Sequence, residues 1–196
     1  MKRGILFWIL LITTVTVPAV PEERAQGLTV ARLDREPAID GKIEEAVWKQ
    51  ATLIQEFYQT QPGDNTPPSY PTEAMLGYDS KSLLIAIRAT DDPKSIRATF
   101  ARRDDISSDD SVAIYLDTFH DQRKAYVLMF NPLGVQQDGI FSEHGKTDYS
   151  IDIVMQSRGT LTASGYSIEI AIPVVNFCAG GLPIPVHRSM PATTKI

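Results

Sequence analysis

Apolar and polar residues alternate along several short stretches of this chain, most cleanly between Gly165 and Pro173. There the apolar set is Tyr166, Ile168, Ile170 and Ile172, and the intervening set is Ser167, Glu169 and Ala171. Successive side chains of a β-strand point to opposite faces, so this period of two is typical of a strand. We expect this strand to pack its isoleucine face on a core and to show its other face to solvent.

Similar short runs, bounded by Gly, Pro, Asp and Asn, recur at residues 28–32, 54–59, 73–79, 83–89, 111–119, 125–131, 135–141 and 151–157. About nine strands with frequent turns favour an all-β fold, an antiparallel β-sandwich that resembles a jelly roll. Helical patterns of the length needed for parallel crossovers do not separate the runs. The sequence therefore predicts one sandwich domain over residues 28–173.

The one helical pattern of this region spans residues 43–50 and ends near Trp48. An Asp40-Gly41 turn precedes it, and Ile43, Ala46 and Val47 place apolar groups on the same side as the tryptophan. Trp48 could be a platform for a sugar ring or a plug for a core. A short helix beside a sheet caps the sandwich, so we expect about two helical turns over its open end, with Trp48 in the core.

The first residues differ from the rest of the chain. Lys2 and Arg3 precede an apolar run over residues 5–17, which is shorter than the ~20 residues that span a bilayer. The pattern is typical of a signal peptide over residues 1–19, followed by a linker over residues 20–27; an uncleaved anchor is the alternative. Either interpretation predicts export to the periplasm, the cell surface or the medium. The single cysteine, Cys178, cannot form an internal disulfide, so the core must stabilise the domain.

Composition narrows the choice of function. The chain has 196 residues and a formal net charge of -5, without a basic stripe, which argues against a nucleic-acid partner. Its three histidines lack zinc-site spacing, and neither a nucleophile elbow nor a phosphate-binding glycine loop occurs. We therefore expect no enzyme activity.

Aspartates gather in the expected loops, and Asp109, Asp110 and Asp117 are the candidates for a metal site. Calcium binds several oxygens from adjacent loops, so these carboxylates could ligate it. Aspartate is also favoured in turns, where its side chain accepts backbone hydrogen bonds. The turn interpretation is preferred, and calcium remains the alternative cofactor.

Several strings in order resemble the family 9 carbohydrate-binding modules: "PAIDGKIEEAVWKQA" resembles their N-terminal signature and "DDSVAIYLDTFHD" their central strand. The longer string at residues 101–139 is similar to a branch found at the N-terminus of large exported bacterial proteins, in which a membrane-associated β-rich region follows. The resemblance covers residues 36–173. It implies a β-sandwich, carbohydrate binding, frequent calcium sites and attachment to glycan-degrading enzymes.

The chain departs from this family at the sugar clamp. Where the resemblance expects a tryptophan wall, the chain has Ile106-Ser107-Ser108, and Ala113 stands where a glutamate often follows the valine. The second clamp aromatic would lie beyond residue 173. Residues 174–196 lose the alternation, so we expect an irregular, truncated tail.

Two functions follow from these observations. The first is a module that binds a polysaccharide or oligosaccharide through loops containing Arg102, Arg103, Asp104, Phe141, Asp148 and Tyr149. Tyr149 is the best stacking platform, although a strand-start aromatic is the alternative. The second is a structural domain that docks on a membrane-associated remainder and binds no sugar. A glycosidase is disfavoured because no acid/base pair stands out.

Overall fold

The computed structural model describes residues 28–61, 63–119, 121–143 and 145–176. The expected signal peptide, the linker, Cys178 and residues 177–196 of the expected tail lie outside these ranges. Among the described residues, no helix is long and apolar enough to cross a membrane.

The described chain is built of strands, which confirms the all-β prediction. Their bounds are β1 (Ala31–Arg32), β2 (Thr52–Ile54), β3 (Thr72–Tyr78), β4 (Ser82–Thr90), β5 (Val112–Leu116), β6 (Lys124–Phe130), β7 (Gln136–Ser142), β8 (Gln156–Thr162) and β9 (Gly165–Pro173). Two short 3-10 helices accompany them, η1 (Ala46–Gln50) and η2 (Val174–Asn176).

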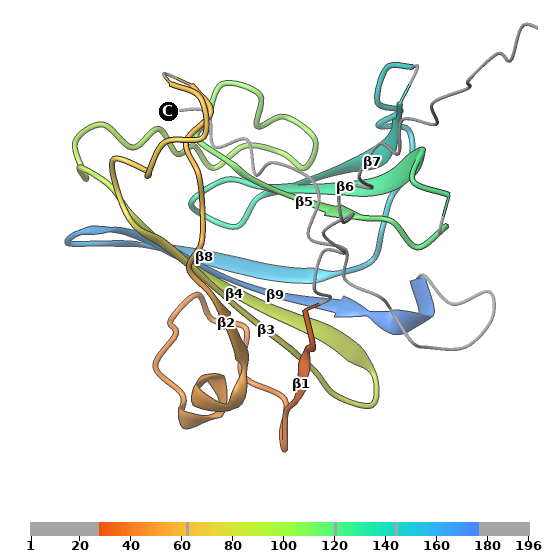
Figure 1. Cartoon of the computed structure of the whole chain (residues 1–196), viewed down its shortest axis with the longest axis horizontal. Helices are drawn as coiled ribbons and strands as arrows, with labels where there is room; N and C mark the ends of the chain where they lie inside the picture. The colour runs from red at the N-terminus through yellow and green to blue at the C-terminus, as the bar shows by residue number, and fades with distance from the viewer. Residues whose placement is uncertain (1–27, 62, 120, 144, 177–196) are drawn as a thin grey trace, which may run out of the picture.

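The strands form two sheets that face each other (Figure 1). The larger has the order β1-β3-β4-β9-β8, and β2 pairs with β3 beside β1. The smaller has the order β5-β6-β7. All pairs are antiparallel except β1 with β3.

The main core lies between the sheets. The apolar set of β9 points into it, as the alternation predicts, with Ile168, Ile170 and Ile172 fully buried. From the smaller sheet, Leu128 and Phe130 of β6 meet this layer. Burying these branched and aromatic side chains is the main favourable term that holds the sheets together.

A second core covers the outer face of the larger sheet. It contains Leu33, Val47, Trp48, Met75, Leu84, Ala86 and Ala171. The intervening residues of β9 are therefore buried as well, and the expectation that they face solvent is wrong: Ser167 is 6%, Glu169 0% and Ala171 4% exposed. The cause is the segment over residues 33–51, which lies on this face of the sheet.

Trp48 is 3% exposed, which confirms that it is a core residue. Its position differs from the prediction, because η1 lies against the outer face of the larger sheet and not over the open end of the sandwich (Figure 1). The helix is also shorter than expected. It is a 3-10 helix of five residues, in which Trp48 N donates to Glu45 O at 3.2 Å.

One carboxylate ties this segment to the sheet. Glu169 Oε1 accepts a hydrogen bond from Trp48 Nε1 at 2.7 Å, and Oε2 accepts from the backbone N–H groups of Gly41 at 2.9 Å and Asp40 at 3.1 Å. Gly41 has a φ of +87°, and a Cβ there would lie 2.7 Å from Thr160 Oγ1. The Asp40-Gly41 turn therefore needs glycine to approach the sheet this closely.

Candidate functional site

The outer face of the smaller sheet carries three aromatic side chains, Tyr115, Phe141 and Tyr149, which we call the aromatic face. Cross-strand register places Tyr115 beside Val127 and Val127 beside Gly139. The alternate residues of these strands, such as Ile114 and Leu128, point into the main core. The aromatic face is therefore the side of this sheet that looks away from the sandwich.

Tyr149 lies across β7 on a glycine. A Cβ at Gly139 would be 2.9 Å from Tyr149 Cδ1 and 2.6 Å from Asp148 O, so a larger residue would displace the ring. The backbone of Asp148 exchanges hydrogen bonds with Ile140 at 2.9 and 3.0 Å, and Tyr149 Oη reaches Met129 Sδ at 4.0 Å. Gly139, the backbone of Asp148 and Met129 thus hold Tyr149 in place, while the residue stays 42% exposed.

Tyr115 and Phe141 extend this surface. Their rings meet edge to face, with centroids 5.8 Å apart and planes at 89°. Burial, with a smaller effect from nearby Tyr149, raises the pKa of the Tyr115 phenol. Tyr115 therefore stays neutral at physiological pH and can donate a hydrogen bond to a ligand.

Arg103 does not join the aromatic face. Its guanidinium pairs with Asp138, lies 3.2 Å from an Asp152 oxygen, and donates to Ile153 O at 2.9 Å. Asp138 is opposite Leu128 in the register and therefore points to the interior side of β7. Burial raises the pKa of Asp138, and the Ile153 N–H and Arg103 partly oppose this rise. Arg103 thus closes the edge of the core beside β7.

The other polar candidates have separate positions. Arg102 is exposed. Asp104 adopts a φ of +67° and its Oδ1 accepts weakly from Asp138 N at 3.4 Å, beside Arg103. Asp148 Oδ1 accepts from Ser150 N at 2.9 Å, and hydrogen bonds from Ser150 lower the pKa of Asp148. Of the predicted sugar contacts, Phe141 and Tyr149 therefore lie on the aromatic face. Asp148 pairs with Ile140, whose register partner Tyr126 packs on the main core, so the Asp148 side chain points to the opposite side of the sheet. Arg103 and Asp104 lie at another edge.

The three aspartates proposed for calcium hold loops together. Asp109 Oδ2 accepts from Thr99 N at 2.9 Å and from Asn131 Nδ2 at 2.8 Å. Burial pushes the pKa of Asp109 upward, but these hydrogen bonds outweigh it and leave the pKa low. Asp110 accepts from Arg97 N, and Asp117 from Phe119 N and Gln122 N.

These contacts do not fit a calcium site. Within the described ranges, no three His, Cys, Asp or Glu side chains come together in a way that could hold a metal ion. Calcium needs six or more oxygens, and here the carboxylate oxygens already accept from loop N–H groups. The arrangement supports the turn interpretation.

We accordingly expect chelation to leave the stability of the domain unchanged. A cation that binds only the native state would raise the melting temperature by mass action, and its removal would lower it. Thermal melts with EDTA and with added calcium measure this. A melting temperature that falls with EDTA and recovers with calcium would contradict the expectation.

The family described as "Carbohydrate family 9 binding domain-like" matches residues 39–190. The chain belongs to this family. Its members are carbohydrate-binding modules and not enzymes, which confirms the expected absence of catalysis. No curated protein matches the chain significantly.

Solved structures of similar proteins agree with the fold. A family 9 carbohydrate-binding module from Caldicellulosiruptor kristjanssonii, in complex with glucose, has 17% identity and a TM-score of 0.54 over 78% of this chain and 71% of its own. The same organism's family 9 module with cellotriose gives 18% identity and a TM-score of 0.50, over 71% and 64% of the two chains. A protein from Bacteroides uniformis, provisionally described as carbohydrate-binding, gives 11% and 0.59, over 80% and 76%. At these low identities, the structural similarity shows a shared fold.

The aromatic face contains residues that the sequence did not single out. Tyr115 and Met129 were missed, although period-two alternation in β5 and β6 puts both on the face opposite Ile114 and Leu128. Ala113, where the family resemblance expects a glutamate, pairs with Met129 and lies on this same face. The position at which the family resemblance expects a glutamate thus falls on the aromatic face.

Proposed function

We propose that this non-catalytic domain binds a polysaccharide or oligosaccharide on the aromatic face. The observation that carries the proposal is Tyr149, whose ring lies against Gly139 while the residue is 42% exposed. A rigid exposed ring can contact the apolar C–H face of a pyranose without losing side-chain freedom on binding. The neutral Tyr115 phenol supplies a hydroxyl partner for sugar hydroxyls beside it.

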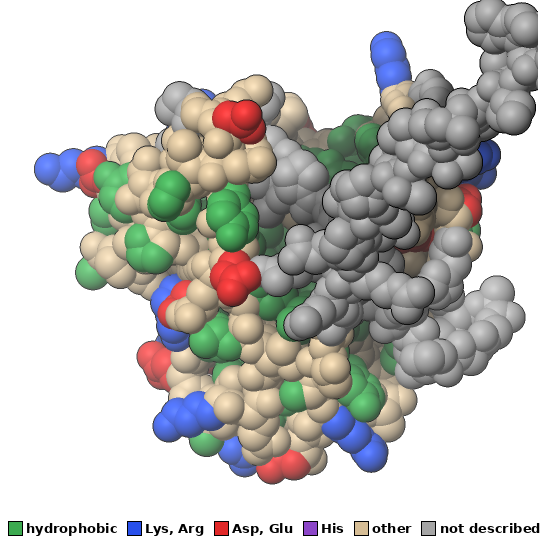
Figure 2. Space-filling view, viewed as in Figure 1, with side chains coloured by type: hydrophobic (Ala, Val, Ile, Leu, Met, Phe, Trp, Pro, Cys, Tyr) green, Lys and Arg blue, Asp and Glu red, His purple; other side chains and the backbone are tan. Residues whose placement is uncertain are grey.

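A neutral ligand also agrees with the surface charge. Figure 2 shows acidic and basic side chains intermixed over the viewed part of the described surface. The formal net charge of -5 would repel a polyanion such as a nucleic acid. This distribution supports a ligand that is recognised by stacking and hydrogen bonds.

Binding is expected to be weak, because Tyr149 can stack on only one face of a sugar ring. Two aromatic walls desolvate a sugar ring from both faces, and the chain has Ser107 where the resemblance expects a tryptophan wall. We expect dissociation constants for cello- and xylo-oligosaccharides in the millimolar range.

Replacing Tyr149 by alanine should reduce this affinity at least about fivefold, since stacking on an aromatic face contributes roughly 1 kcal/mol or more. Isothermal calorimetry against cello-oligosaccharides measures the change. Tyr78→Ala is the matched control, because Tyr78 is similarly exposed, at 39%, and lies at the end of β3 in the other sheet. A micromolar dissociation constant for the wild type would contradict the expected weakness. No measurable binding, or equal affinity of Tyr149→Ala, would overturn the proposal.

We propose that the protein is located outside the cytoplasm and takes part in carbohydrate breakdown. The basic and then apolar residues at positions 2–17 support export. Cell fractionation of the native host would test this: recovery of the protein in the cytoplasm alone would contradict it.

A structural role is the second candidate. The domain would then dock on a membrane-associated β-rich part of a longer protein and bind no sugar. The replacement of the expected tryptophan wall by Ile106-Ser107-Ser108 favours it. A pulldown on insoluble polysaccharides separates the candidates, since only the first predicts retention that Tyr149→Ala abolishes.

A further inference from the structure

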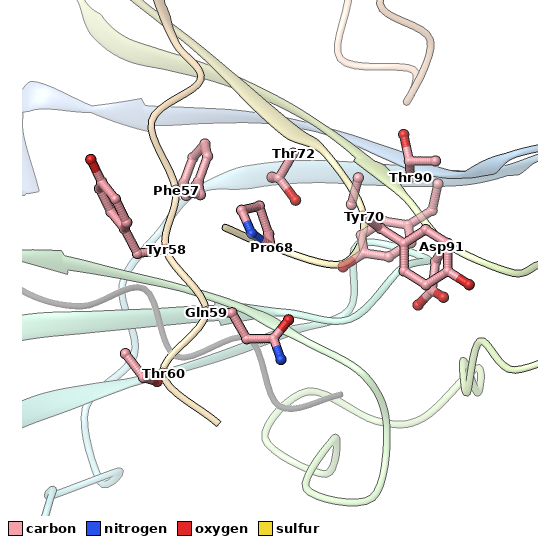
Figure 3. A pocket seen from close by; sticks show the side chains of 11 residues that line it. Phe57, Tyr58, Gln59, Thr60, Pro68, Tyr70, Thr72, Thr90 and Asp91 are labelled. Atoms are coloured by element: carbon pink, nitrogen blue, oxygen red, sulfur yellow. The ribbon is translucent and has the colours of Figure 1, made fainter. Parts of the chain in front are cut away.

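A small pocket opens at one end of the sandwich, away from the aromatic face. It lies where β3 begins, β4 ends and β9 begins, with Thr72, Thr90 and Tyr166 in its wall. The segment before β3 forms the rest, including Pro68 and Tyr70 (Figure 3). The cavity has a volume of about 60 Å³. It shares no residue with the aromatic face and belongs to the larger sheet.

The segment that carries Tyr70 is fixed by its own hydrogen bonds. Gln59 and Thr66 form a two-way backbone bridge at 2.7 and 3.1 Å, and Gln59 Oε1 accepts from both the N–H and the hydroxyl of Ser69. Thr90 N donates to Pro71 O at 3.0 Å. Tyr70 therefore lies between two hydrogen-bonded residues, Ser69 and Pro71, and it is 42% exposed.

The wall of the pocket contains the phenol of Tyr166. Tyr166 is 4% exposed, and among the described residues its phenol makes no hydrogen bond. Burial first, and then the carboxylates of Asp110 and Asp91, raise the pKa of Tyr166 to about 12. The phenol is therefore a neutral donor at any physiological pH. As a donor in the wall of the pocket, this hydroxyl is suited to pair with a bound molecule.

An acceptor lies beside this donor. Asp91 lines the pocket and uses Oδ1 to accept from Asp92 N at 2.7 Å and Ser95 Oγ at 3.3 Å, so Oδ2 can accept from a ligand hydroxyl. Figure 3 shows Tyr70 and Asp91 on one side of the opening, with Phe57 and Tyr58 on the other. A hydroxyl that entered here would meet both a donor and an acceptor, next to an exposed aromatic ring.

We propose that this pocket is a second sugar subsite, which takes the hydroxymethyl group of a hexopyranose whose ring stacks on Tyr70. A cavity needs about 10–15 Å³ to hold one water-sized group, so this one has room for both the CH₂ and the OH. The hydroxyl accepts from Tyr166 Oη and donates to Asp91. The sugar class rests on the proposed function; the location does not.

The subsite discriminates between hexoses and pentoses. A xylose unit has no hydroxymethyl group on C5, so it would place no group in the cavity and would not pair with Tyr166 Oη. Lost apolar contact and a lost hydrogen bond together should weaken binding about tenfold. Glucose-based chains are therefore preferred over xylose-based chains at this end of the sandwich.

The test uses methyl β-glucopyranoside and methyl β-xylopyranoside with the full chain carrying Tyr149→Ala, which silences the aromatic face. NMR amide shifts report where each sugar binds. We expect the glucoside to shift Thr72, Thr90 and Tyr166, with about tenfold lower affinity for the xyloside. Equal shifts from both sugars, or no shifts at these residues, overturn the proposal.

Two variants localise the contact. Tyr166→Phe keeps the buried ring and removes only the hydroxyl, so it should weaken glucoside binding about three- to tenfold without affecting the xyloside. Tyr70→Ala should abolish binding of both sugars, and Tyr78→Ala should change neither. Full glucoside affinity in Tyr166→Phe would sink the inference. Binding at the aromatic face is followed separately, through the amide shifts of residues around Gly139. The proposal for the aromatic face and the proposal for the pocket can therefore fail independently.

Discussion

Replacing Trp48 by alanine should lower the free energy of unfolding by about 3–5 kcal/mol, the usual loss for a truncated core aromatic. The side chain is 3% exposed and packs in the second core with Met75 and Leu84. Its removal also takes the donor from Glu169 Oε1, which accepts from Trp48 Nε1 at 2.7 Å. Urea melts of both proteins measure the loss.

Trp48→Phe separates the two contributions. It keeps most of the apolar contact and removes the N–H, so its effect should be smaller, about 1–3 kcal/mol. Neither variant should change sugar binding at temperatures where it is folded, because Trp48 is far from solvent. An unchanged midpoint with lost sugar binding would show that Trp48 is a binding residue instead.

Local sequence signals predicted the role of Trp48 and missed that of Glu169. The Asp40-Gly41 turn and the apolar residues after it place a tryptophan beside a sheet, which is a local pattern. Alternation in β9 assigns Glu169 to the face opposite the isoleucines, but it cannot tell what covers that face. The covering donors belong to residues up to 129 positions earlier, and such long-range pairing leaves no periodic signal.

The candidate site shows the same limit. Phe141 and Tyr149 were recognisable as aromatics outside the core pattern, and the structure brings them together with Tyr115. Arg103 is close in sequence to other charged loop residues, yet it pairs with Asp138, which points to the interior side of β7. The next residue, Gly139, points to the opposite face. A single-residue difference in register separates a surface contact from a core contact.

Replacing Glu169 by alanine should be about as damaging as removing Trp48. Three N–H donors, from Asp40, Gly41 and Trp48, would lose their acceptor in a region where Glu169 is fully buried. Each unpaired buried donor costs about 1–3 kcal/mol, so a loss of at least about 3 kcal/mol is expected. Glu73→Ala is the contrast: its ion pair with Arg88 is partly exposed and should contribute less than about 1 kcal/mol. Comparable losses for both variants would contradict the assigned role of Glu169.

The pH dependence of this effect has a definite sign. Burial raises the pKa of Glu169, and the hydrogen bonds from Trp48, Gly41 and Asp40 lower it only in part. The native state therefore binds the Glu169 carboxyl proton more tightly than the unfolded state does. The resulting contribution to the free energy of unfolding is fully present below the ordinary glutamate pKa of about 4.3, and it is lost as the pH rises through the native pKa. Glu169→Gln cannot titrate, and its amide nitrogen cannot accept from Trp48 Nε1. It should thus be less stable than the wild type near pH 4, and the difference should narrow as the pH is raised. Urea melts of both proteins across this range measure the difference, and a gap that widens with pH would mean that the three donors hold Glu169 ionised in the native state.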